Sequence, residues 1–504
     1  MNSLLNAMKN GSNYTYTENG AVTHVTSNSA LLDMFGMGGS MRNRSDEDII
    51  FMFKKAYDEN PEYALKCLFY LRDVRGGQGE RRFFRTVINW LAREDKNAIL
   101  RNLEAIPEMG RWDDLYALIG TPVEKEVFYL INKQLLLDVE SKTPSLLAKW
   151  LKSENTSSPY SKTLGRKTRE ALGMTPKQYR KMLSMLRGRI KIVETLMSQN
   201  RWDEIEFDKI PSKAGLIYKN VFATKDITKE RYAAFMANKE TKVNAAVLNP
   251  VDIAKQIFTT SRYAVRSVDR LAWDKYWANL KDYYNGREER GIAVVDVSGS
   301  MNGTPLYAAV SMGAYIAERG KGPFQNHFIT FSDQPELVKF EGTDLYDKFH
   351  RAESANWRNS TNIEAVFDLL LSTAIKNHVS QDEMPETLYI FSDMEFNSCM
   401  TDNTITRSSW GSLVRRVLRD STAVNTLIEK KMREWKAYGY KAPNVIFWNL
   451  NAHQDNIPAI GDGFFYVSGN SMNVIESILS RTPPKTAYQL MMDVLTRDRY
   501  KNIH

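Results

Sequence analysis

The octapeptide VVDVSGSM, residues 294–301, places one Asp and two Ser at alternate positions behind an apolar run. We expect Asp296 to end a buried strand and Ser298 and Ser300 to lie in the following turn, so that the three side chains converge at the carboxyl edge of a sheet. Carboxylate and hydroxyl oxygens are hard ligands that suit Mg²⁺, Ca²⁺ or Mn²⁺ better than zinc. The pattern predicts part of a divalent-metal site, with Mg²⁺ as the first choice.

Three oxygens leave a divalent ion incompletely bound, so further ligands should come from neighbouring strand-end loops. Thr361 stands at the mouth of the helical run NIEAVFDLLL, and Asp393 follows the apolar run ETLYIFS. The set of Asp296, Ser298, Ser300, Thr361 and Asp393 resembles the metal-ion-dependent adhesion site of von Willebrand factor A domains. That resemblance implies a coordination position left open for a partner's acidic group. Taken alone, Asp-x-Ser-x-Ser also fits a turn that caps the next helix.

Catalytic constellations are absent from the sequence. The six histidines have no metal-type spacing, and RGGQGERR is too short to form a phosphate loop. A general base or nucleophile needs a poised partner, which is usually histidine. We therefore predict a binding protein and not an enzyme, and a metal-dependent phosphodiesterase at Asp296 and Asp393 remains the third hypothesis.

Two regions with different hydrophobic periods must position these residues. Residues 286–504 alternate short apolar strands with helices, which predicts a mainly parallel sheet covered on both faces. Residues 45–285 read as helix after helix, with apolar residues at spacings of three and four. GRWDDLYAL (110–118) recurs as NRWDEIEF (200–207), which favours stacked helical repeats of the HEAT type or else two unrelated helix starts. The predicted fold class is an α-solenoid followed by an α/β domain.

The first 44 residues have a third character. YTYTENGAVTHV carries an Asn-Gly turn between alternating segments, which predicts a small β-hairpin. The glycine-rich GMGGSMRNRS that follows is expected to be a mobile connector.

Composition narrows the cellular setting. With 504 residues the chain is too long for one ordinary core, and with only two cysteines it has no disulfide framework. No run of about 18 apolar residues occurs, so no membrane span is expected. These features predict a reducing, cytoplasmic location.

Positive charge is concentrated between residues 142 and 191, where 13 Lys or Arg face two acids, Glu154 and Glu170. A solvated helix face normally mixes signs, so phosphate binding is the simplest reason to gather like charges, and it does not separate RNA from DNA. Tyr160, Tyr179 and Trp150 are interleaved and could stack on bases or pack in a core. The residues predicted to bind nucleic acid are Arg166, Lys167, Arg169, Lys177, Arg180, Lys181, Arg187, Arg189 and Lys191. A second basic group comprises Arg72, Arg75, Arg81, Arg82 and Arg85.

Several phrases resemble the Ro proteins, the RNA-binding family defined by the TROVE module followed by a von Willebrand A domain. They are LFYLRDVRGGQGERRFF, NLEAIPEMGRWDDLYAL, LNPVDIAKQI and VVDVSGSMNG, and an uncharacterised Ro-like family with the same layout is closer still. The resemblance implies a monomeric ring of helical repeats completed by the A domain. It also implies small non-coding RNA as the partner, bound at structured parts and single-stranded ends, and a role in RNA chaperoning and quality control. The alternative is a metal-dependent protein-interaction scaffold without RNA binding.

Overall fold

The computed structural model describes residues 13–190, 192–331, 334–353, 362–397, 426–479 and 486–504. The chain forms two compact units. The α/β unit comprises residues 1–44, 250–259 and 282–494, and the helical unit comprises residues 45–249, 260–281 and 495–504. The prediction of a helical part and an α/β part is thereby confirmed.

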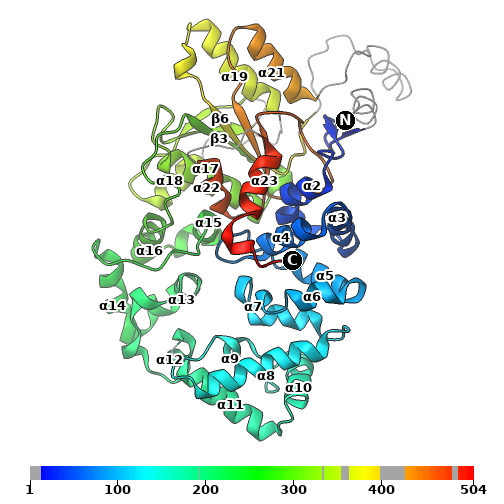
Figure 1. Ribbon diagram of the computed structural model, residues 1–504. Helices are drawn as coiled ribbons and strands as arrows, with labels where there is room; N and C mark the ends of the chain where they lie inside the picture. The colour runs from blue at the N-terminus through cyan, green and yellow to red at the C-terminus, as the bar shows by residue number, and fades with distance from the viewer. Residues whose placement is uncertain (1–12, 191, 332–333, 354–361, 398–425, 480–485) are drawn as a thin grey trace. The chain divides into compact units, whose positions relative to one another are not determined.

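A six-stranded sheet forms the centre of the α/β unit, in the order β5-β4-β3-β6-β7-β8. All neighbours are parallel except β4 and β5, as the continuous apolar runs predict. Figure 1 shows α19 and α21 on one face of this sheet and α17 on the other. The strands are β3 (Gly291–Asp296), β4 (His327–Phe331), β5 (Leu337–Lys339), β6 (Thr387–Ser392), β7 (Asn444–Asn449) and β8 (Phe464–Ser468).

The helices of this unit bury apolar faces against the strands. On α17, Gly313 leaves room for Val295 of β3, because a Cβ atom at this position would overlap the valine side chain. The helices are α2 (Ala30–Met37), α15 (Pro250–Thr259), α17 (Thr304–Arg319), α18 (Leu345–Glu353), α19 (Ile363–Lys376), α21 (Leu427–Ala437), α22 (Ile475–Ile478) and α23 (Ala487–Leu495).

The N-terminal segment belongs to the same unit. Strands β1 (Tyr14–Tyr16) and β2 (Val22–His24) form the predicted antiparallel hairpin, and Gly20 in its turn has a φ of 86°. The prediction of a mobile connector at GMGGSMRNRS is wrong. Residues Gly38–Asn43 form a 3-10 helix, and the Gly39 amide donates to Ser468 Oγ at 2.9 Å. The glycines are there because backbone packs directly on β8, where a Cβ atom on Gly39 would meet Ser468.

Sequence signals account for the ends of the main helices of the helical unit. Asn60, Ser158 and Thr175 each cap a helix with the side chain, and each is followed by proline at the first helical position. The longer helices are α3 (Asp46–Glu59), α4 (Pro61–Arg72), α5 (Arg82–Glu94), α8 (Glu124–Glu140), α10 (Pro159–Ala171), α11 (Pro176–Arg189), α13 (Ser212–Thr224), α14 (Asp226–Ala237) and α16 (Ser267–Ala278). The shorter ones are α6 (Lys96–Arg101), α7 (Ala105–Met109), α9 (Leu147–Trp150) and α12 (Val193–Ser198).

The predicted ranges 1–44, 45–285 and 286–504 differ from the two units in how segments are grouped. Besides residues 1–44, helix α15 also joins the α/β unit, where Phe258 stacks on Tyr307 of α17 with ring centroids 5.3 Å apart. Residues 495–504 join the helical unit, where the buried Asp73 carboxylate accepts hydrogen bonds from Arg499 and Tyr500. Each segment packs on residues that are distant in sequence. Helix α15 stacks an aromatic ring on α17, and residues 495–504 hydrogen-bond to Asp73.

Candidate metal centre and candidate nucleic-acid interface

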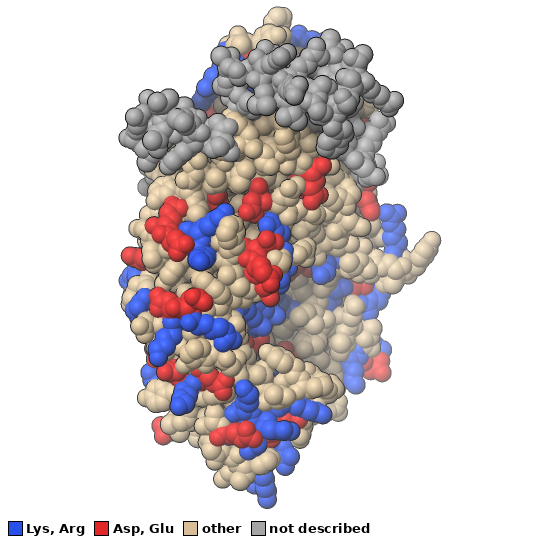
Figure 2. All heavy atoms as spheres, turned by 90° about the vertical axis from the view of Figure 1, so that its right-hand side faces the viewer, with Lys and Arg blue, Asp and Glu red and all other residues tan. Residues whose placement is uncertain are grey.

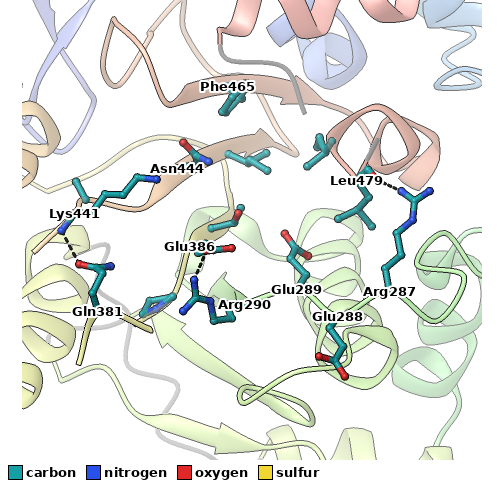
Figure 3. A pocket seen from close by; sticks show the side chains of 15 residues that line it. Arg287, Glu288, Glu289, Arg290, Gln381, Glu386, Lys441, Asn444, Phe465 and Leu479 are labelled. Atoms are coloured by element: carbon teal, nitrogen blue, oxygen red, sulfur yellow. Dashed lines mark hydrogen bonds and ion pairs between the residues drawn. The ribbon is translucent and has the colours of Figure 1, made fainter. Parts of the chain in front are cut away.

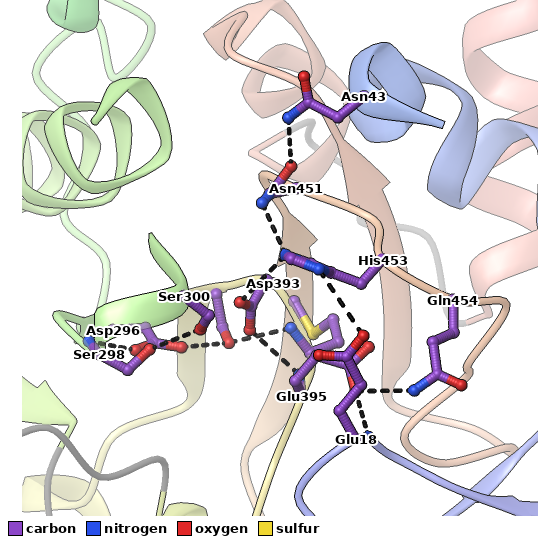
Figure 4. A network of polar contacts seen from close by, with 12 residues as sticks. Glu18, Asn43, Asp296, Ser298, Ser300, Asp393, Glu395, Asn451, His453 and Gln454 are labelled. Carbon is purple, nitrogen blue, oxygen red and sulfur yellow. Dashed lines mark hydrogen bonds and ion pairs between the residues drawn. The ribbon is translucent and has the colours of Figure 1, made fainter. Parts of the chain in front are cut away.

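Two buried carboxylates meet at the carboxyl edge of the sheet. Asp296 is the last residue of β3, and Asp393 directly follows β6. These strands are adjacent and parallel, with Val295 opposite Phe391, so their ends coincide. Both aspartates are fully buried. The convergence that the sequence predicts for these two residues is present (Figure 4).

The two serines lie in the turn that enters α17. The Ser298 amide donates to Asp296 Oδ1 at 2.9 Å, which ties the turn to the strand end. Ser298 Oγ and Ser300 Oγ are 3.1 Å apart, so both hydroxyls lie on the same side of the turn. Ser298 is buried and Ser300 is exposed. Thr361, the fifth predicted ligand, lies outside the described residues.

The electrostatics of this edge favour a cation. Burial, reinforced by the negative charge of Asp393, raises the pKa of Asp296 to about 7. Ser392 Oγ donates to Asp296 Oδ2 at 2.5 Å, and the Glu395 amide donates to Asp393 Oδ1 at 3.1 Å. Asp393 Oδ2 is buried and accepts no hydrogen bond from any described residue. Such an oxygen is costly to bury without a partner, and the donor set Asp, Asp, Ser, Ser fits a hard divalent ion.

Sequence reasoning missed the residues that surround this centre. His453 Nε2 lies 3.8 Å from Asp393 Oδ2 and 2.8 Å from Asn451 Nδ2. From the N-terminal hairpin, Glu18 places a carboxylate oxygen 3.8 Å from His453 Nδ1 and donates its amide to Glu395 Oε2 at 2.7 Å. Glu395 was detectable because it stands two positions after Asp393 in FSDMEF, whereas the loop carrying His453 offers no pattern.

The basic residues of α11 divide into two groups with different contacts. The capping box of Thr175 and Gln178 fixes the start of the helix, so Tyr179, Leu183 and Leu186 face the core. Lys177 and Lys181 are four positions apart, and Arg180 lies beside them on the outer side. All three are exposed, and their side chains make no ion pair or hydrogen bond within the described part of the chain.

The Arg187 side chain, by contrast, is hydrogen-bonded within the helical unit. Its guanidinium donates to the carbonyl oxygens of Ala148 and Leu151, each at 2.8 Å, and to Ser153 Oγ at 3.0 Å. These acceptors belong to α9 and the loop after it, so Arg187 joins α11 to that segment. Its predicted role as a phosphate ligand is therefore not supported by its contacts.

The remaining predicted cations are also divided. Arg169 is paired with Glu154 at 2.8 Å and Glu170 at 2.9 Å, and Arg189 donates to the Val139 carbonyl at 2.7 Å. Lys167 lies 3.8 Å from Glu124, whereas Arg166 is exposed with no side-chain partner among the described residues. Lys191 lies outside the described residues.

One further cation shares this surface. Lys162, four residues before Arg166 on α10, is exposed and also without a partner in the described chain. Spacing of four on a helix was the signal that could have found it. In Figure 2 the lower end, where α10 and α11 lie in Figure 1, carries more Lys and Arg than Asp and Glu.

A groove of about 610 Å³ runs beside α11 and is entered by Arg180. Its two acids are already neutralised, because Glu194 pairs with Lys149 at 3.1 Å and Glu154 pairs with Arg169 at 2.8 Å. Arg180 and Arg187 are the two lining cations that no described carboxylate pairs with. Arg187 is held by carbonyl and hydroxyl oxygens, whereas the Arg180 side chain has no partner among the described residues. The lining also supplies the hydroxyls of Ser153, Ser184 and Thr195.

None of the helices in the chain's described ranges is both long enough and apolar enough to cross a bilayer.

Comparison with known proteins places the chain in a family. A model described as domain of unknown function DUF2828 matches residues 17–147 and 138–282, more than half of the chain, and one described as domain of unknown function DUF7788 matches residues 290–497. Uncharacterized protein L728 of Acanthamoeba polyphaga mimivirus is 29% identical over 517 residues, covering 93% of this chain and 85% of the viral protein. A solved structure, the Ro (RSR) protein of Deinococcus radiodurans, aligns over 90% of this chain and 99% of its own with 14% identity and a TM-score of 0.38. The chain belongs to the family described as domain of unknown function DUF2828.

Proposed function

We propose that this protein binds RNA through the surface of α10 and α11, and that its α/β unit holds a divalent cation for structure or for a partner's carboxylate. The observation that carries RNA binding is the set of cations without an internal partner. Arg166, Lys177, Arg180 and Lys181 are exposed on consecutive helices, and no described carboxylate neutralises them. We refer to these four residues as the basic face.

Binding to a phosphodiester backbone would account for this concentration of unpaired positive charge. Each neutralised phosphate releases condensed counterion, which provides a favourable free energy that isolated surface charges do not obtain within the protein. The adjoining groove can take a nucleotide beside Arg180, and Tyr160 of α10 is 68% exposed and therefore available for base stacking. Tyr179 is fully buried and belongs to the core. A face with one stacking side chain and several cations favours single-stranded segments and RNA ends.

The metal centre contributes binding and not catalysis in this proposal. Asp296, Ser298, Ser300 and Asp393 would hold the ion, Mg²⁺ first, and leave a position for an acidic group of a partner protein. The cation would act by neutralising two carboxylates and by drawing a third. The finer assignments, a HEAT-like repeat domain and a von Willebrand A domain of the Ro-like layout acting in the cytoplasm, rest on the motif order in the sequence. Ring closure and a monomeric state stay predictions.

The test is RNA binding measured by fluorescence anisotropy with labelled oligouridylate over a range of salt concentrations. The variant Lys177→Ala, Arg180→Ala, Lys181→Ala removes three cations of the basic face. Lys54→Ala, Lys96→Ala, Lys239→Ala is the matched control, because it removes three exposed cations elsewhere in the helical unit. If each removed cation contacts one phosphate, the negative slope of log affinity against log salt becomes less steep by about 2 in the first variant. The control keeps the wild-type slope.

A different outcome favours the scaffold hypothesis. Wild-type protein that ignores the oligonucleotide at low salt refutes RNA binding by this face. Capture of an acidic peptide that is lost with chelator and with Asp296→Ala would then assign the function to the metal centre, whose buried Asp393 oxygen lacks a hydrogen bond among the described residues.

A further inference from the structure

The α/β unit contains a cavity at the amino ends of the sheet strands, opposite the candidate metal centre. Its volume is about 690 Å³, within the range of small-molecule sites. Thr387 begins β6 and Asn444 begins β7, and both line the cavity. Asp296 and Asp393 stand at the carboxyl ends of β3 and β6. The two sites are therefore separated by the length of the strands.

The inner wall of this cavity is apolar. Ile446 of β7 and Phe465 of β8 are 1% and 5% exposed, and Leu479 closes the wall after α22. These side chains belong to the core of the sheet, so a ligand lying on them would bury its own apolar surface. Burial of each methylene contributes about 0.8 kcal/mol.

The charged groups of the lining are unequally engaged. Arg290 pairs with Glu386, and the Arg287 guanidinium donates to the Leu479 carbonyl. Glu289 accepts a hydrogen bond from the Tyr389 hydroxyl at 2.6 Å, and burial raises the pKa of this carboxyl. Two exposed charged side chains of the lining, Glu288 and Lys441, make no hydrogen bond or ion pair with any described residue, and they stand at different places on the rim.

The backbone of Lys441 is fixed at the cavity, and its ammonium group is available to bind a ligand. Its backbone amide donates to Gln381 Oε1 at 2.7 Å, which fixes the segment before β7, while its ammonium has no partner in the described chain. Figure 3 shows its side chain extending toward Asn444, which also lines the cavity and whose side-chain amide forms no hydrogen bond with any described residue. An ammonium and an amide beside an apolar wall match a carboxylate attached to an apolar body.

We propose that this cavity binds an amphipathic organic anion, with its carboxylate on Lys441 and Asn444 and its apolar body on Ile446, Phe465 and Leu479. The inference is independent of RNA binding and of the metal centre. It assigns a small-molecule site to the amino edge of the sheet.

Titration calorimetry of the full chain with hexanoate, octanoate and decanoate tests the proposal, with decylammonium as the probe of opposite charge. We expect affinity to rise about fourfold for each added methylene, and decanoate to bind in preference to decylammonium. Lys441→Met keeps the apolar stem and should weaken decanoate about tenfold through loss of one charge-assisted hydrogen bond. Lys436→Met, on the exposed side of α21, is the matched control and should bind like wild type.

Two results would overturn the assignment. Equal decanoate affinity in Lys441→Met and wild type would show that the ammonium does not hold the anion. Preference for decylammonium would assign the cavity to cations through Glu288 and Glu289. Both variants should retain the wild-type unfolding temperature, which separates a lost contact from a lost fold.

Discussion

Replacing Arg187 by alanine should destabilise the helical unit, whereas replacing Arg180 on the same helix should leave its stability unchanged. The Arg187 guanidinium donates three hydrogen bonds, to Ala148, Leu151 and Ser153, and alanine removes all of them. The Arg180 side chain has no partner within the described residues, so its removal breaks no internal contact.

The magnitude follows from the number and setting of these bonds. A hydrogen bond from a charged donor contributes about 1.5–3 kcal/mol when buried, but Arg187 is only partly buried and water can reach some of the freed acceptors. At about 1 kcal/mol each, the three bonds amount to about 3 kcal/mol. In a unit of this size that loss lowers the unfolding midpoint by about 6–12 °C.

Differential scanning calorimetry of wild type, Arg187→Ala and Arg180→Ala measures this difference, with oligouridylate affinity as the second readout. We expect Arg187→Ala to have a lower unfolding temperature than wild type. Arg180→Ala should have the wild-type unfolding temperature and bind RNA more weakly. If Arg187→Ala unfolds with wild type and loses RNA affinity instead, its three contacts are not structural. The division of α11 into a structural and a basic side would then be wrong.

Three further perturbations test other parts of the structure. Mg²⁺ at 100 times its dissociation constant should stabilise the α/β unit by about 2.7 kcal/mol, and a calorimetric shift that survives Asp393→Ala would contradict the metal centre. Burial alone would raise the pKa of Asp269, but hydrogen bonds from Arg266 and Lys219 lower it to about 2. The resulting stability of up to about 2 kcal/mol is therefore present above pH ~4 and lost as the pH falls toward 2, so acid titration of Asp269→Asn should be flatter there than that of wild type. Gly313→Val should cost about 1–3 kcal/mol in urea unfolding because the new side chain overlaps β3, and an unchanged midpoint would argue against the packing of α17.

The parts of the fold that were predictable are those with local signals. The apolar run before Asp296 and the one before Asp393 indicated two strands, and Asp296 does end β3 while Asp393 directly follows β6. Proline after Ser158 and after Thr175 marked two helix starts. These patterns involve only neighbouring residues, so hydrophobic periodicity and helix-capping preferences suffice to predict them.

The parts that escaped prediction depend on residues far apart in the sequence. Counting charges made Arg187 equivalent to Arg180, because the carbonyl groups that engage Arg187 leave no trace in side-chain identity. Glycine at position 39 indicated mobility, yet it serves close packing on β8. His453 approaches Asp393 of the candidate metal centre from a loop after β7, and no local sequence pattern indicates this contact.

The contacts between N-terminal and C-terminal residues also determine when, during synthesis, each unit can complete its packing. Gly39 and Ser468 are 429 positions apart, and Asp73 and Arg499 are 426 apart. A ribosome adding 5–20 residues per second needs roughly 20–90 s to cover such a distance. During that interval the hydrophobic α2 has no strand to cover, and Asp73 has neither Arg499 nor Tyr500. Neither unit can be completed before these C-terminal partners have been synthesised, so a truncation that removes residues 464–504 should leave two incomplete folds.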